Sequence, residues 1–495
     1  MPSRTLSGIG AMRRGLFNIH EGSAGRLDGL VESPIEERIL IEGATLWDEP
    51  LGQRPGSLVV DRGRISQCLD PDETVDRNDE LTVIDATGGF VMPGLIDTHV
   101  HMLFDSDASL LKNAQSLIRD WLDETDKGTR YTQNVVERGQ LKLKSGVTTM
   151  RILGDGYYSL SYRDDLAAWS VVGPRVLTAA VHVNTRGGYI SGGIAAGLSE
   201  EDQDLTAVNL DSYDEIEPKL TTLISRGIDV VKISTTHGDL GFGDAAPDLP
   251  ERWVKKIVDV AHDAGLKVTA HSYGNEGNWA AVRGGVDGIE HLVNVPHSLD
   301  DDLVKEISDR GIYVCPTLAG SSYSVTKVLN DPDHLVSELD IVSNVTARVR
   351  RDILITTGAL QMPGFVRFAL HEPSAFRKWE VWRQMSLQNT ASLHDAGVPL
   401  IFGTDTPFTI GNFWHSVSNE ANALAEAGVA NSDILAMATS HASKALGISD
   451  DVGTLAEGKS ADILVLENNP LKDLANLDSV SAVIKQGRVV YRTTP

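Results

Sequence analysis

The middle of the chain alternates short apolar runs with helix-like segments, and this alternation limits the fold more than any other feature. It predicts helices over 213–226, 251–264 and 301–310, each followed by an apolar run. Glycines mark helix ends, as expected where a left-handed residue closes a helix. The predicted strands are 91–101, 147–153, 175–180, 229–234, 266–271, 288–292, 312–316 and 398–405. The closing glycines are Gly227, Gly265, Gly285, Gly311 and Gly397.

Eight strands joined by helices predict an α/β fold, namely a distorted TIM (β/α)8 barrel over residues 91–445. In such a barrel the functional side chains gather at the C-terminal ends of the strands. The segment from about 331 to 390 is too long for a plain connection between strand and helix. We therefore expect an insertion there, covering the mouth of the site or forming an oligomer contact.

Both ends of the chain carry strand patterns of a different character. Residues 36–90 and 446–495 are predicted to form the two parts of one small composite β-sandwich, since chain ends often lie close together. Residues 1–35 are rich in glycine and serine, without a clear period, and are predicted to be an N-terminal extension.

The charge balance excludes some classes of partner. The 495 residues include 44 basic and 69 acidic side chains, a formal net charge of −25, which argues against nucleic acid. No apolar run approaches the roughly 18 residues of a membrane helix, so no membrane partner is expected. Cys68 and Cys315 make no disulfide framework, and a cytoplasmic location is the expectation.

Six polar side chains lie in or at the ends of five predicted strands. His99 and His101 are two residues apart, so on a strand they point to the same side. Each of the six also fits an ordinary polar position, but Lys232 lies inside Val-Val-Lys-Ile, where burying an ammonium is costly. Six such residues at one barrel face predict a functional site. They are His99, His101, Lys232, His271, His291 and Asp405.

The order and local motifs of these residues resemble the amidohydrolase superfamily. They look most like its imidazolonepropionase and prolidase-like branch, to which phenylurea and molinate hydrolases also belong. The likeness covers roughly residues 37–495. It rests on Pro93-Gly-Leu-Ile-Asp-Thr-His-Val-His101, Val231-Lys-Ile-Ser, Thr269-Ala-His-Ser-Tyr-Gly, Gly288-Ile-Glu-His, Gly403-Thr-Asp-Thr and the tail from Val452 to Leu466.

The resemblance implies two divalent metal ions, with Zn²⁺ expected first and Co²⁺ or Mn²⁺ as alternatives. His99, His101 and Asp405 would hold the more buried ion, and His271 and His291 the other. Lys232 would bridge both ions as a carbamate formed with carbon dioxide. Asp405 would also be catalytic, taking a proton from the attacking hydroxide and passing it to the leaving amine.

Other residues bear on the substrate. Single-metal deaminases of the superfamily lack the bridging lysine and usually have a glutamate shortly after the fifth-strand histidine. Here Ser272-Tyr273-Gly274 follows His271, which favours hydrolysis over deamination. Prolidase-like relatives tend to have Gly-Gly-His where this chain has Gly187-Gly188-Tyr189. Candidate substrate contacts are Tyr273, Tyr189, His237 and Arg186, the last being one of two arginines considered for a substrate carboxylate.

The sequence therefore predicts a binuclear metal-dependent hydrolase of an amide-type C–N bond in an apolar small molecule such as a urea, carbamate or anilide. A dipeptidase of the Xaa-Pro or Xaa-Arg type is the alternative within enzymes, and a hydrolase of imidazolone-type cyclic amides comes third. A metal-free structural relative is the alternative from another class. Because relatives of this branch are commonly homo-oligomers, the resemblance also implies a homo-oligomer.

Overall fold

The computed structural model describes most of the chain, with gaps at both ends and around the predicted insertion. His237, most of the extension 1–35 and the insertion up to residue 372 lie outside the described residues, so the expectations for them stay predictions. Backbone alone is described at 193–194 and 373–379. The described residues are 28–31, 35, 38–49, 51–75, 77, 81–102, 122, 126–195, 197–236, 248–319, 373–406 and 416–493.

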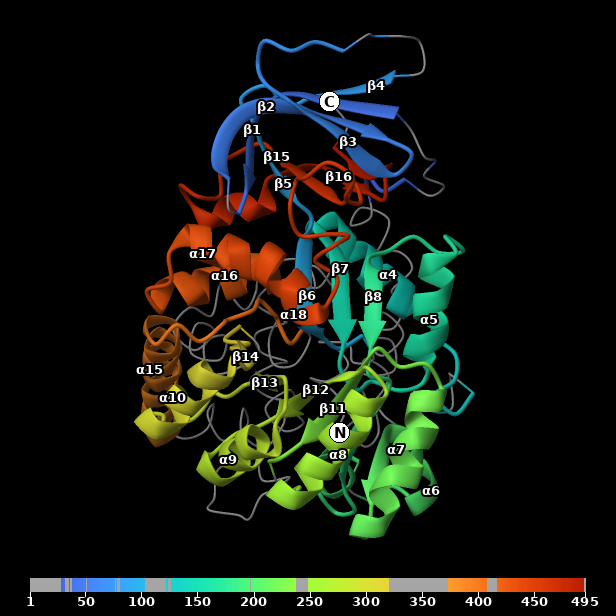
Figure 1. The fold of residues 1–495 in the computed structure, drawn as a ribbon, viewed down its shortest axis with the longest axis vertical. Helices are drawn as coiled ribbons and strands as arrows, with labels where there is room; N and C mark the ends of the chain where they lie inside the picture. Colours follow the sequence, from blue (N-terminus) through green and yellow to red (C-terminus); the bar gives the residue numbers. More distant parts are fainter. Residues whose placement is uncertain are drawn as a thin grey trace, which may run out of the picture.

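The two ends of the chain form one mixed sheet at one end of the molecule (Figure 1). Its eight strands run in the order β17-β16-β15-β5-β1-β2-β3, with β4 paired to β1. The ends meet at β5, which pairs in parallel with β1 and antiparallel with β15. The strands are β1 Arg38–Asp48, β2 Gly52–Asp61, β3 Arg64–Leu69, β4 Leu81–Asp85, β5 Phe90–Pro93, β15 Ile463–Leu466, β16 Val480–Lys485 and β17 Arg488–Arg492.

The composite domain is thus built from both chain ends, as predicted. The structure differs from the expected sandwich in one respect. Backbone hydrogen bonds join all eight strands into a single sheet. Its own apolar core joins the two ends of the chain, because Ile41 and Leu58 from the first part are buried in one cluster with Ile463 and Ile484 from the second. The strand β5 belongs to this sheet, and the central fold starts just after it.

Parallel strands in two sheets make up the centre of the molecule. The orders are β6-β7-β8 and β10-β9-β11-β12-β13-β14. Because their inward and outward faces are both covered, the strands are almost wholly buried, as is usual for parallel sheets. They are β6 Leu95–Val100, β7 Val147–Ile152, β8 Arg175–Thr178, β9 His182–Thr185, β10 Ala207–Leu210, β11 Val230–Ser234, β12 Lys267–His271, β13 Gly288–Glu290 and β14 Tyr313–Cys315.

Single hydrogen bonds and bridges link these sheets into a ring. The Asp229 N–H donates to the Thr178 carbonyl at 2.9 Å, which joins β8 to the entry of β11. On the other side, parallel bridges connect Val314 with Leu400 and Val100 with Thr406. The segment 398–405, predicted as the eighth strand, closes the ring together with the following Thr406 through isolated bridges and makes no regular ladder.

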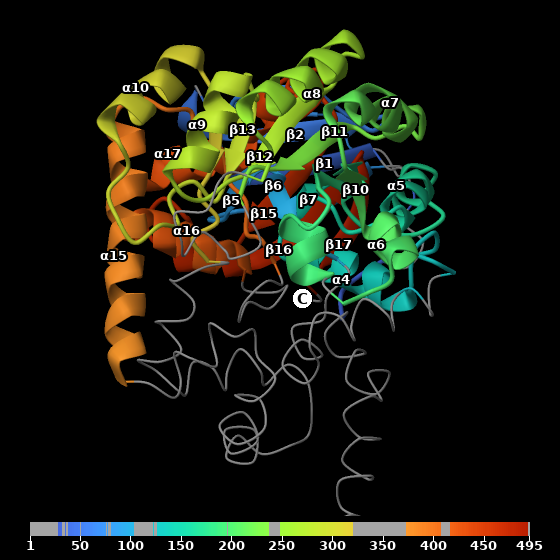
Figure 2. The ribbon, with the colours of Figure 1, turned by 90° about the horizontal axis from the view of Figure 1, so that it is seen from below.

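Helices surround this ring (Figures 1 and 2). Three predicted helices are present as α7, α8 and α10, the first preceded by the 3-10 turn Tyr213–Glu215. The α-helices are α4 Gln133–Lys144, α5 Tyr158–Ala167, α6 Glu200–Thr206, α7 Ile216–Ser225, α8 Glu251–Asp263, α9 Asn275–Gly284, α10 Asp301–Arg310, α15 Pro373–Asp395, α16 Ser416–Glu426, α17 Asn431–Ala436 and α18 Ala442–Leu446. The other short helices are Tyr189–Ile194, Met437–His441 and Leu474–Asp478. Within the described ranges, no helix is long and apolar enough to cross a membrane.

Candidate metal centre

The six predicted ligands converge at the C-terminal ends of the central strands. His99 comes from the end of β6, Lys232 from β11 and His271 from the end of β12. His291 and Asp405 follow β13 and Leu400, each with a positive φ, 70° and 53°. Left-handed backbone is costly for residues with a side chain and is commonly retained at functional sites. All six residues have less than a tenth of their surface exposed.

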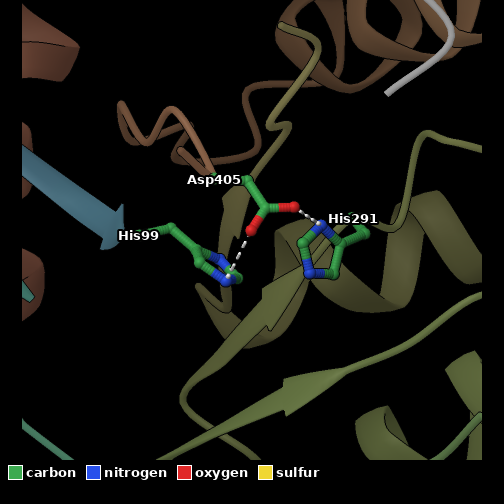
Figure 3. A group of neighbouring side chains, drawn as sticks. All are labelled: His99, His291 and Asp405. Carbon is green, nitrogen blue, oxygen red and sulfur yellow. Dashed lines mark ion pairs between the residues drawn. The ribbon is translucent and has the colours of Figure 1, made fainter. Parts of the chain in front are cut away.

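Asp405 lies between the imidazoles. Its Oδ1 atom is 3.4 Å from His99 Nε2 and 3.3 Å from His101 Nε2, and its Oδ2 atom is 3.8 Å from His291 Nδ1. Figure 3 shows the carboxylate reaching toward His99 with one oxygen and toward His291 with the other. Ligand atoms of these three residues lie within 4.8 Å of one another, the spacing of a metal site.

His271 and His291 lie beside this cluster, with ring centroids 4.7 Å apart. Two tyrosines flank the pair. The Tyr189 ring is 3.9 Å from that of His271, and the Tyr273 ring stacks on His291 at 5.4 Å. Both tyrosines are only half-buried, so they form the rim of the site.

Protein groups fix the orientation of three of the histidines. Glu290 Oε2 is 2.8 Å from His99 Nδ1, Asp155 binds His101 Nδ1, and the Thr317 hydroxyl is 2.7 Å from His291 Nδ1. The other oxygen of Glu290 accepts from Arg151 at 2.7 Å and Thr269 at 2.6 Å. Metal-binding histidines generally have such a partner, which sets the ring and makes it a better ligand.

Several buried polar atoms of the site have no hydrogen-bond partner within the described structure. They are Lys232 Nζ, His271 Nε2 and Asp405 Oδ1. A native protein rarely leaves a buried polar atom unsatisfied, and an unplaced ion is one recognised reason for it. The three atoms belong to the very residues that the sequence marks as ligands, so the donor set fits a metal centre.

Burial controls the protonation of these groups. It holds the pKa of His99, His271 and His291 well below the usual range, so these rings are neutral and able to bind a metal. Burial acts in the same sense on His101, but Asp155 and Asp405 raise its pKa to about 9. Burial also lowers the pKa of Lys232 to about 8, against the opposing charge of Glu290, so its amine loses a proton more readily than an exposed lysine does.

The structure places the predicted substrate contacts in different surroundings. Tyr273 and Tyr189 lie at the rim, next to His291 and His271. Arg186 forms ion pairs with Asp211 at 2.9 Å and with Asp204 at 3.2 Å, so its charge is already compensated. The Gly187-Gly188-Tyr189 segment follows the short strand β9, and a π-helix begins at Tyr189.

Sequence reasoning missed several residues around the site. Glu290 lies inside the Gly288-Ile-Glu-His motif, directly before the predicted ligand His291. Asp155 follows β7 and His182 opens β9, and each contacts the site through groups distant in sequence. Only Glu290 carried a local signal in the sequence, because a carboxylate directly precedes His291. Asp155 and His182 could be recognised only once the neighbouring strands were known.

Comparisons with known sequences show which proteins this chain is similar to. The sequence model described as the amidohydrolase family matches residues 90–490. An uncharacterized protein of Mycobacterium tuberculosis is 24% identical over 453 residues, which are 91% of this chain and 95% of that protein. Ochratoxinase of Aspergillus niger is 23% identical over 411 residues, which are 79% of this chain and 73% of that enzyme.

Solved structures have the same fold. A putative prolidase from Bifidobacterium longum superposes with a TM-score of 0.69 at 26% identity, over 93% of this chain and 96% of that one. Phenylurea hydrolase B gives 0.69 at 21% identity, over 93% and 99% of the two chains. Molinate hydrolase gives 0.69 at 20% identity, over 93% and 95%. Proteins with different substrates thus share this chain's fold.

Proposed function

This chain belongs to the amidohydrolase family, and we propose that it is a binuclear metal-dependent hydrolase that cleaves an amide-type C–N bond in an apolar small molecule. One observation carries the proposal. Four imidazoles, one lysine and one carboxylate meet in a buried site, where three of their polar atoms have no hydrogen-bond partner among the described residues. We further propose that the ring of parallel strands is the distorted (β/α)8 barrel of this family.

The donor set indicates which residues would hold the ions. His99, His101 and Asp405 would bind one ion, His271 and His291 the other, and Lys232 would bind both as a carbamate. Nitrogen and carboxylate donors of this kind accept Zn²⁺, Co²⁺ or Mn²⁺. When bound, such ions lower the pKa of a water molecule and polarise a carbonyl group.

The protein's own groups supply positioning and proton transfer. Asp405 is the acidic group among the proposed ligands, and burial raises its pKa. A carboxyl group with a raised pKa is suited to accept a proton from the attacking water and return it to the leaving nitrogen. Tyr189 and Tyr273 stand beside His271 and His291, where a hydroxyl can hydrogen-bond the substrate carbonyl.

The substrate assignment rests on the rim. Its rings favour an apolar group, and Arg186, which was considered for a free carboxylate, is paired with Asp204 and Asp211. An uncharged urea, carbamate or anilide therefore fits better than a dipeptide. The dipeptidase alternative is supported by the structural likeness to a putative prolidase, and His237 remains a candidate contact for either substrate.

Hydrolysis of a small substrate panel tests the proposal. Metal-loaded protein would be assayed with an N-aryl urea, a thiocarbamate, an anilide, and Xaa-Pro and Xaa-Arg dipeptides. The expected result is turnover of the neutral compounds, lost in Lys232→Ala and Asp405→Asn. Lys255→Ala, on the exposed face of α8, is the matched control.

Each alternative has its own outcome. Turnover of dipeptides alone would show that the protein is a dipeptidase and would rule out the proposed substrate class. Absence of bound metal together with absence of turnover would favour the metal-free structural relative. We also propose a homo-oligomer, for which sedimentation of the full chain is the test.

A further inference from the structure

The His182 ring packs against the backbone at Gly154, where the absence of a side chain leaves room for it. The side chain is buried, and its Nε2 atom is 3.2 Å from the Leu153 carbonyl oxygen. A Cβ atom at Gly154 would lie 1.9 Å from His182 Cδ2, and Gly154 has a φ of +99°. Only glycine permits both the contact and this backbone conformation. The ring is therefore held in one place.

The Leu153 carbonyl also fixes which ring nitrogen carries the proton. A carbonyl oxygen only accepts, so His182 Nε2 donates its N–H, and Nδ1 of the neutral ring is left as an acceptor. This Nδ1 atom is buried and has no partner within the described structure. An unsatisfied buried acceptor costs about 1–3 kcal/mol, which is reason to expect a donor in the active protein.

Lys232 is the neighbour that can supply this donor. In the parallel pairing of β9 with β11, His182 is the register partner of Lys232. Side chains at such positions lie next to each other on the same face of the sheet. Lys232 Nζ is also without a partner among the described residues. A buried donor group and a buried acceptor thus stand on adjacent strands, and neither has a hydrogen-bond partner within the described structure.

We propose that His182 is a positioning residue whose Nδ1 accepts the N–H of carbamylated Lys232 and so orients the carbamate in the site. The proposal rests on the proposed function, which requires that modification. In the reaction, the lone pair of the neutral Nζ forms a bond to the carbon of carbon dioxide, one C–O π pair moves to oxygen, and one amine proton leaves to solvent. A planar carbamate with a single N–H remains.

A substrate N–H is the other source of such a donor. Burial favours the lysine N–H as the donor, because the His182 Nδ1 atom is closed to solvent whereas the rim tyrosines keep a minor part of their surface exposed. A group that enters from outside reaches the rim first, while Lys232 is already inside the site. The two sources predict different effects of the same substitution, which makes them separable.

The test measures the carbamate itself. Protein would be labelled with ¹³C-bicarbonate, and the carbamate signal and its loss on dilution into unlabelled buffer followed by ¹³C NMR, with metal content determined in parallel. In His182→Leu we expect label loss about five- to tenfold faster than in the wild type, as for a lost hydrogen bond of about 1 kcal/mol. His182→Asn places an acceptor oxygen near the Nδ1 position and should restore slow loss.

Four outcomes decide the matter. Wild-type retention in His182→Leu, or equally fast loss in His182→Asn, would overturn the role of His182 while leaving the proposed function intact. Absence of any carbamate signal in the wild type would refute the bridging lysine itself. A fall in the preference for an N–H amide over its N-methyl analogue in His182→Leu, with the carbamate unaffected, would assign the donor to the substrate. If His182→Leu does not fold, comparison of His182→Asn with His182→Gln, whose oxygen reaches the Nε2 side, makes the same distinction.

Discussion

The Nζ atom of Lys142 lies 2.8 Å from Oδ2 of Asp97, and neither side chain is exposed to solvent. Lys142 also donates to the hydroxyls of Thr404 at 3.0 Å and Ser416 at 2.7 Å. Asp97 lies two residues before His99, and Thr404 directly precedes Asp405. One buried ion pair therefore joins α4 to both segments that carry the cluster around Asp405.

The first prediction concerns this ion pair. Lys142→Met should lower the free energy of unfolding by about 3–5 kcal/mol, because it leaves the Asp97 carboxylate buried without its cation. Urea denaturation measures the change, and metal titration shows whether the site loosens with it. Lys255→Met removes an exposed pair with Asp259 and should change stability by less than about 1 kcal/mol. Equal effects of the two substitutions would contradict the prediction.

The second prediction concerns Glu290, which holds His99. Glu290→Gln should weaken metal affinity about 10- to 100-fold, because the neutral amide no longer makes the His99 ring a strong donor. Isothermal titration of metal-free protein provides the measurement. Glu306→Gln removes an exposed partner of Arg310 and serves as the control. Unchanged affinity in folded Glu290→Gln would show that His99 does not depend on this carboxylate.

The strand ends that carry the six candidate ligands could be predicted because each is marked locally. A lysine between apolar residues, or a histidine after a buried run, is visible without knowledge of the fold. The run 398–405, predicted as the eighth strand, lies beside Val314 and Val100 through isolated bridges and makes no regular ladder. The strands β9 and β10 were missed because each has an asparagine among its four residues, Asn184 and Asn209, so neither forms a continuous apolar run.

The groups that orient the ligands could not be predicted in the same way. Lys142 lies on a helix with ordinary neighbours, and its pairing with Asp97 depends on how α4 packs against β6. The position of His182 depends on Gly154 and on the pairing of β9 with β11, and these contacts join residues far apart in the chain. Such contacts are decided by tertiary packing, for which a single sequence carries no local signal.

The third prediction concerns pH and the terminal sheet. Lys485 is almost fully buried, and burial lowers its pKa to about 8 in spite of the opposing charge of Asp462. Between about pH 8 and the unfolded value near 10.5, the unfolded chain binds more protons, so stability should rise with pH. Below pH 8 the cost of the buried charge is present in full.

Replacing this lysine should remove that cost. Lys485→Met should be more stable than the wild type at pH 7, by on the order of 2 kcal/mol after allowing for the lost contact with the Trp169 ring. Urea denaturation at pH 7, 9 and 10.5 would show the difference shrinking as pH rises. Lys472→Met, at an exposed position, should show no such trend. A variant less stable at pH 7 would contradict the sign.

The fourth prediction concerns removal of the metal. Because Lys232, His271 and Asp405 have polar atoms without hydrogen-bond partners among the described residues, an ion bound there should stabilise the folded state. A free metal concentration of about 100 times the dissociation constant should raise the free energy of unfolding by about 2.7 kcal/mol. Chelation should therefore lower the melting temperature and abolish hydrolysis, and added Zn²⁺ should restore both. Asp405→Asn should lose most of the Zn²⁺-dependent shift, whereas Cys68→Ser, which removes a thiol outside the site, should keep it. A shift retained in Asp405→Asn and lost in Cys68→Ser would mean that the ion binds elsewhere.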